Sequence, residues 1–90
     1  MKRYVIERDL PGVGGMSKDE LCGAARTSND ALGQLAPKVQ WQHSYVTGDK
    51  TFCIYLAEDE DAIRKHAELS GFPATKITEV TGIIDPTTAR

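Results

Sequence analysis

The chain has 90 residues, of which 40% are hydrophobic and 27% are charged, and its formal net charge is -2 at pH 7. A chain of this length forms a single domain, residues 1–90, and its composition excludes a disordered protein. The acidic and basic residues are interspersed without a basic stripe, which argues against nucleic acid as a partner. No apolar run approaches the ~20 residues that a membrane span needs, so we expect no membrane insertion.

The first element in chain order is a strand. Arg3–Arg8 is short, rich in β-forming residues and closed by Pro11-Gly12. No signal-peptide core precedes it, so we expect a cytoplasmic protein. Gly12–Gly15 follows, and we interpret it as a flexible connection, because it has neither the spacing of a dinucleotide-binding fingerprint nor the lysine of a P-loop.

A helix follows from Ser17 to about Leu35. Ser17 and Glu20 have the spacing of a capping box, in which each side chain accepts a hydrogen bond from the other residue's backbone N–H. Small and apolar residues then repeat at steps of four and three, which predicts one buried helical stripe; they are Leu21, Ala25, Ser28, Leu32 and Leu35. Pro37 ends the helix.

A β-hairpin comes next, with strands at 39–47 and 51–56 and a turn at Gly48-Asp49. Alternation along the first of these strands places Trp41, His43 and Tyr45 on one face. A two-residue turn puts His43 and Cys53 on opposite faces of the sheet, whereas a turn one residue longer brings them together. The two-residue turn gives the more uniformly apolar face, and we favour it.

The remaining elements are a helix and a strand. The acidic run Glu58–Asp61 marks the start of the helix, where the helix dipole favours negative charge. One side of this helix carries Ala62, Ile63, His66, Ala67 and Ser70. Gly71 is placed to end it, and 76–84 reads as the last strand.

The element order is therefore β-α-β-β-α-β, which predicts an α+β fold of the ferredoxin-like type. Such a fold has a four-stranded antiparallel sheet with both helices on one face. The other face is bare, and a bare, partly aromatic sheet face on a small domain favours a partner. With one kind of chain, we expect a second copy about a two-fold axis.

Four residues are candidate ligands for a transition metal: His43, Cys53, His66 and Glu7. Imidazole, thiolate and carboxylate suit nickel(II) and similar divalent ions. Each residue also has a purely structural alternative. His43 packs on a sheet face, Cys53 packs as a small apolar group, His66 donates to a backbone carbonyl, and Glu7 points to solvent. Because the chain holds only two histidines, a His-rich metal store is excluded.

Two other features favour structural readings. Cys22 and Cys53 are too few for a small disulfide scaffold, so we expect two free thiols. The Glu58–Asp61 run lacks the spacing of a calcium loop, and we expect a solvated helix start. No nucleophile with a neighbouring base can be argued from spacing.

Several segments resemble a family of small bacterial ferredoxin-like domains of otherwise unknown function, which includes a dimeric nickel-binding protein. The residues that carry the resemblance are Trp41-x-His43-Ser44-Tyr45-Val-Thr-x-Asp49-Lys50, Cys53-x-Tyr55, Asp61-Ala-Ile-Arg-Lys-His66-Ala, Gly71-Phe72-Pro73, Glu7-Arg8 with Pro11-Gly12, and Ile84-Asp85-Pro86. The resemblance spans nearly the whole chain. It implies a homodimer that can hold nickel(II), and it does not imply an enzyme.

The leading hypothesis is thus a cytoplasmic homodimer that sequesters or buffers nickel(II), with other divalent transition metals as alternatives. A second hypothesis is a small-molecule enzyme of the dimeric α+β barrel type, with an apolar pocket near His43 and this residue as general base. A third is an interaction module whose sheet face binds another protein. An apolar cavity lined by His43 would favour the enzyme over the metal-binding protein.

Overall fold

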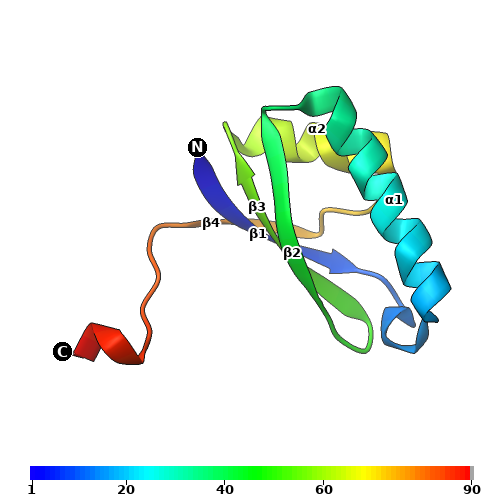
Figure 1. Ribbon diagram of the computed structural model, residues 1–90, viewed down its shortest axis with the longest axis horizontal. Helices are drawn as coiled ribbons and strands as arrows, with labels where there is room; N and C mark the ends of the chain where they lie inside the picture. Colours follow the sequence, from blue (N-terminus) through cyan, green and yellow to red (C-terminus); the bar gives the residue numbers. More distant parts are fainter. Residues whose placement is uncertain (90) are drawn as a thin grey trace.

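The sheet and helices follow the predicted order. The computed structural model describes residues 1–89, which form β1 (Lys2–Asp9), η1 (Val13–Gly15), α1 (Lys18–Leu35), β2 (Val39–Val46), β3 (Lys50–Ala57), α2 (Glu60–Ser70), β4 (Lys76–Val80) and η2 (Pro86–Ala89). The four strands make one sheet in the order β2-β3-β1-β4, and all three neighbouring pairs are antiparallel. Both helices lie on one side of this sheet (Figure 1). The fold is the ferredoxin-like arrangement that the sequence predicts.

The helix ends are set by local hydrogen bonds, as predicted. Ser17 Oγ accepts from the Glu20 N–H and Glu20 Oε1 accepts from the Ser17 N–H, both at 3.1 Å. Asp59 Oδ1 accepts from the Ala62 N–H at 2.9 Å and begins α2. Gly71 ends α2 with φ of 77°, a conformation that favours glycine. No helix within residues 1–89 is long and apolar enough to cross a membrane.

The core lies between the helices and one face of the sheet, here named the inner face. Its buried members come from β1, β2, β3 and α2; they are Tyr4, Ile6, Val39, Cys53, Tyr55, Ala57 and Ile63. The predicted stripe of α1 packs toward this face, and Ser28 is 4% exposed. Alternation along β1 and β3 therefore supplies one apolar layer to the helices.

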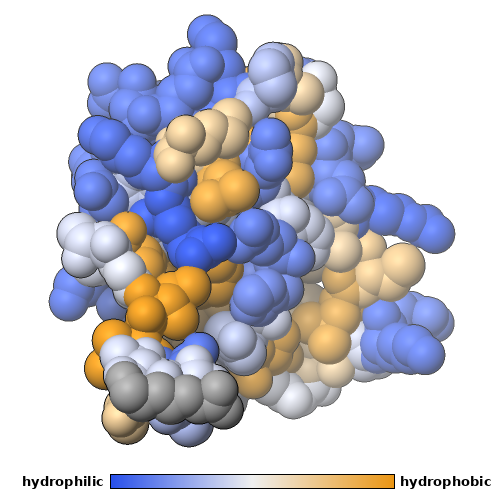
Figure 2. Space-filling model, turned by 60° about the vertical axis from the view of Figure 1, so that its left-hand side comes forward, coloured by the Kyte–Doolittle hydropathy of each residue, from blue (hydrophilic) through white to orange (hydrophobic). Residues whose placement is uncertain are grey.

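The opposite face of the sheet, here named the outer face, has no helix on it (Figure 1). Half-buried apolar residues run across it: Val5, Phe52, Ile54, Leu56 and Val80. Figure 2 turns this side toward the viewer and shows apolar surface gathered between charged side chains. Charged and polar residues, among them Arg3, Glu7 and His43, share this face with the apolar strip.

The glycine loop at 12–15 is fixed to the hairpin, which corrects the expectation of a flexible connection. The Gly14 N–H donates to Gly48 O at 2.9 Å, and the Gly12 N–H donates to Asp49 Oδ1 at 2.9 Å. Val13 between them is 4% exposed. A Cβ on Gly14 would lie 2.6 Å from Thr47 O, so only glycine allows this approach of two backbones.

The last strand is shorter than predicted. The expected strand at 76–84 ends at Val80, which pairs with Arg3. Since β1 begins at Lys2, the residues after Thr81 have no strand beside them to pair with. The following segment instead projects away from the sheet (Figure 1) and exposes two isoleucines, Ile83 at 68% and Ile84 at 86%.

Candidate functional site

The hairpin has the two-residue turn that the sequence favours. Thr47 N–H donates to Lys50 O at 2.9 Å, and Ser44 pairs with Cys53. His43 pairs with Ile54 and therefore lies on the outer face. This register separates His43 from Cys53 within one chain.

A β-bulge at Gln42 corrects the predicted facing of Trp41. Trp41 pairs with Tyr55 and His43 with Ile54, so Gln42 has no opposite residue. The extra residue shifts the alternation by one, which turns Trp41 to the inner face. There its ring stacks on Tyr55 with centroids 6.5 Å apart, and its Nε1 donates to Ser44 Oγ at 2.9 Å.

His43 lies exposed on the outer face beside Tyr45. The Nε2 atom of the imidazole is 3.2 Å from the Tyr45 hydroxyl oxygen, and the two rings meet edge to face at 5.1 Å. The imidazole is open to solvent. Of the four candidate ligands, it is the most exposed.

Glu7 also lies on the outer face, opposite Phe52. Its side chain is 25% exposed, and its Oε1 lies 3.8 Å from Lys50 Nζ. Lys50 is shared with Asp9 at 3.6 Å, so this ammonium faces two carboxylates. Glu7 points neither fully to solvent nor into a formed ligand cluster.

Cys53 lies on the inner face, 5% exposed, among the core residues. Its Sγ is 3.5 Å from Thr51 Oγ1. This is the packing that an apolar group of its size would have. Cys22 lies on the exposed side of α1, and both thiols are free.

His66 is fully enclosed between the helices and the sheet. Its Nε2 lies 3.2 Å from Ser28 Oγ and 3.4 Å from Ser28 O, and Ser28 Oγ is 3.3 Å from the Tyr55 hydroxyl. Burial, with the nearby Arg8 guanidinium, lowers the pKa of His66, so the neutral imidazole is favoured. Burial likewise raises the pKa of Tyr55.

The four candidate ligands therefore fall into two pairs on opposite sides of the sheet. His43 and Glu7 lie on the outer face, while Cys53 and His66 lie on the inner face. Within residues 1–89, no three side chains among His, Cys, Asp and Glu are grouped so that they could hold an ion. The acidic run at 58–61 serves the helix start, where Asp59 caps α2. One chain thus offers an accessible imidazole and carboxylate but no complete ligand set.

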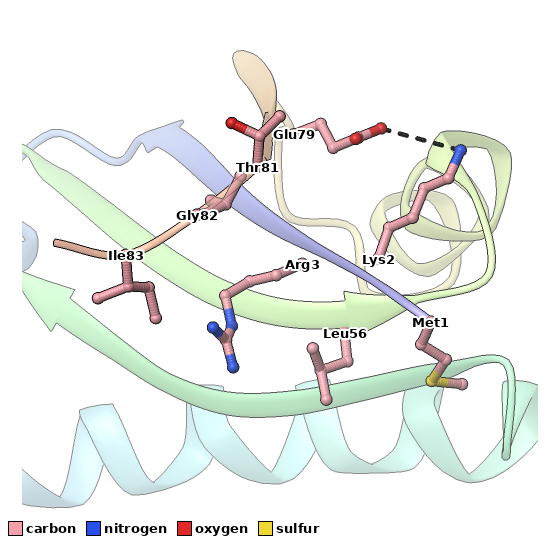
Figure 3. Close-up of a pocket in the computed structure, with 9 residues that line it drawn as sticks. Met1, Lys2, Arg3, Leu56, Glu79, Thr81, Gly82 and Ile83 are labelled. Atoms are coloured by element: carbon pink, nitrogen blue, oxygen red, sulfur yellow. Dashed lines mark ion pairs between the residues drawn. The ribbon is translucent and has the colours of Figure 1, made fainter.

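His43 lines neither of two hollows in the part of the chain formed by residues 1–89. The first, of about 590 Å³, is open and lies between the starts of β1 and of the C-terminal segment. Figure 3 shows Arg3, Leu56 and Ile83 around it, with the Lys2–Glu79 ion pair at its rim. The second, of about 430 Å³, lies on the inner face beneath α1.

Sequence reasoning missed Arg8, which lines the second cavity and is only 2% exposed. A signal was present in the sequence. Tyr4, Ile6 and Arg8 occupy alternate positions of one strand, so the strand period places the arginine on the same face as two core residues.

Comparison with known proteins yields one family and one structure. The family described as "Nickel responsive protein SCO4226-like" matches residues 4–80. The fold is similar to the crystal structure of SCO4226 from Streptomyces coelicolor A3(2), with a TM-score of 0.76 and 17% sequence identity, over 91% of this chain and 99% of that chain. No curated protein sequence matches the chain significantly.

Proposed function

The chain belongs to the SCO4226-like family of nickel-responsive proteins, and from this premise we propose that it is a cytoplasmic homodimer that binds nickel(II) at the outer face of its sheet. Its role would be to sequester or buffer the ion. The observation that carries the proposal is the exposed imidazole of His43, placed on a helix-free sheet face directly beside a half-buried apolar strip.

The apolar strip supports the homodimer. Phe52, Ile54 and Leu56 stand on the central strand β3 and have no helix above them. A contiguous apolar patch rimmed by polar residues is typical of a protein interface, and a single kind of chain satisfies it through a two-fold axis. The exposed Ile83 and Ile84 on the projecting C-terminal segment supply further apolar surface for a second copy.

The accessibility of the candidate ligands supports a nickel(II) site on the outer face and not on the inner face. His43 and Glu7 are reachable from solvent, whereas Cys53 and His66 are buried under the helices. Nickel(II) accepts imidazole nitrogen and carboxylate oxygen, with water in the remaining positions. One chain brings too few ligands, so the residues fit the ion only when two copies contribute His43 and Glu7 together.

Calorimetric titration of untagged, chelator-stripped protein with Ni(II), Zn(II) and Cu(II) tests the proposal. We expect saturable nickel binding that is lost in His43→Ala and retained in the matched control His66→Gln. Binding that survives His43→Ala but is lost in His66→Gln would move the site to the inner face. A wild-type protein that binds no nickel would end the proposal.

The oligomeric state is measured separately by sedimentation velocity. We expect a dimer for the wild type and a monomer for Ile54→Asp, since the substitution places a charge in the apolar strip. The matched control Gln34→Asp, exposed on α1 on the other side of the sheet, should remain dimeric. A monomeric wild type would remove the second set of ligands on which the metal site depends.

A further inference from the structure

The inner face holds a cavity that the metal-binding proposal does not use. Its volume is about 430 Å³, within the range of small-molecule sites. Apolar side chains form most of the wall, among them Val13, Met16, Leu21, Trp41, Val46 and Phe72. On the side of α1 the wall includes two short side chains, Ala24 and Ala25.

Arg8 places a positive charge in the wall of this cavity. Its side chain is 2% exposed, and its Nη1 donates to the carbonyl oxygens of Phe72 and Pro73 at 3.3 and 3.0 Å. The guanidinium carbon lies 5.9 Å from the centroid of the Tyr55 ring. Carbonyl dipoles and an aromatic face orient the guanidinium, but neither cancels its charge.

Within residues 1–89, no carboxylate neutralises the charge of Arg8 by forming an ion pair with it. None of the ion pairs formed there includes it, and its Nη2 is buried with no hydrogen-bond partner. The nearby Tyr55 phenol stays neutral, because burial raises its pKa. A buried guanidinium without an anion is costly, and a buried donor without an acceptor adds to that cost.

We propose that this cavity binds a small organic carboxylate, with the carboxylate on the Arg8 guanidinium and an apolar body against the wall beneath α1. Arginine and carboxylate form the strongest charge-assisted pairs in proteins, and the apolar wall accepts a chain or ring but not a polar tail. The hydroxyl of Thr51, which also lines the cavity, offers a second donor to the carboxylate. The site lies on the opposite face of the sheet from His43, so the proposal of carboxylate binding does not depend on the proposal of nickel binding.

Trp41 is the single tryptophan of the chain and lines the cavity, so its fluorescence reports occupancy. The probe is octanoate, compared with 1-octanol, which has the same apolar body without the charge. We expect a saturable change of Trp41 fluorescence with octanoate and at least tenfold weaker binding of octanol. Equal affinities for the two, or no saturable change with octanoate, would overturn the proposal.

Two substitutions on β1 test whether Arg8 is the residue that binds the carboxylate. Arg8→Met should weaken octanoate binding at least tenfold, to the level of octanol, whereas Arg3→Met on the outer face of the same strand should leave it unchanged. Octanoate binding that survives Arg8→Met would overturn the proposal. If Arg8→Met fails to fold by circular dichroism, Ala25→Leu decides the question, since it keeps Arg8 and fills the cavity from α1. This variant should lose octanoate binding, and a wild-type affinity would refute the site.

Discussion

The two faces of the sheet differ in how far their polar side chains are exposed to solvent. On the inner face, Ser28, Tyr55 and His66 are buried, and Ser28 Oγ lies within hydrogen-bond distance of both the Tyr55 hydroxyl and His66 Nε2. On the outer face, His43 and Tyr45 lie open to solvent over an apolar strip. The two histidines of the chain thus have different roles, because one is enclosed as part of the packing and the other is free to meet an ion.

The largest expected difference between the faces is in stability. Ile6 is fully buried on the inner face, and Ile6→Ala should lower the free energy of unfolding by about 2–5 kcal/mol. Ile54 is half-buried on the outer face, and Ile54→Ala should cost less than about 2 kcal/mol. Urea unfolding at low protein concentration measures both, because a dimer would add concentration-dependent stability at Ile54. Equal losses would mean that both faces are equally enclosed.

The second expected effect is a loss of stability where the glycine loop at 12–15 contacts the turn of the hairpin. Gly14→Ala puts a Cβ 2.6 Å from Thr47 O and 2.8 Å from Gly48 Cα, so backbone must shift. We expect a loss of about 1–3 kcal/mol in thermal or urea unfolding. The neighbouring Gly15→Ala has open space around its Cβ and should change stability by less than about 0.5 kcal/mol. Similar losses for both would contradict the close approach.

The third effect is a pH dependence that originates on the inner face. Burial and Arg8 lower the pKa of His66 in the folded protein, so the unfolded chain takes up the proton first as pH falls. The free energy of unfolding should therefore decrease as pH drops below about 6.5, the ordinary histidine value, and this contribution should be constant above it. Urea unfolding at pH 7.5 and 5.5 should show a smaller decrease in His66→Gln than in the wild type. The same decrease in both would remove His66 as its source.

The smallest effect distinguishes the two thiols. Cys22 is exposed on α1 and Cys53 is buried on the inner face. In the native protein, Ellman's reagent should react quickly with Cys22 alone, and Cys22→Ser should abolish the fast reaction. Cys53 should react only after unfolding. A fast reaction in Cys22→Ser would show that the inner face opens readily.

The sequence predicts those parts of the fold that depend on local chemistry. The capping box at Ser17 and Glu20, the acidic start of α2 and the glycine that ends it each act through neighbours in the chain, and all are confirmed. The two-residue turn likewise gave the hairpin register. These features could be predicted because the residues that decide them lie within a few positions of one another.

Where a feature depends on residues far apart in the sequence, the prediction was wrong or the feature was missed. The bulge at Gln42 cannot be seen in the pattern from Trp41 to Val46, because it depends on how Trp41 packs against Tyr55. The end of β4 depends on where β1 begins. Arg8 was overlooked because a charge in a short strand suggests solvent, although the strand period places it inward. For the candidate site, the sequence named four ligands and, with the two-residue turn, placed His43 and Cys53 on opposite faces. The tertiary fold adds that Glu7 lies on the face of His43 and that His66 is buried on the side of Cys53.

The bulge at Gln42 also reverses the inward–outward alternation of β2 between its two parts. Before it, Val39 and Trp41 serve the packing under the helices; after it, His43 and Tyr45 form the outward chemistry. Substitutions of the outward-facing His43 or Tyr45 can therefore change what the protein recognises without altering Val39 or Trp41, which pack on the inner face. Deleting Gln42 would make β2 a regular strand and place Trp41 and His43 on opposite positions of one alternation. A change in which side chains face outward would then also change which side chains pack in the core.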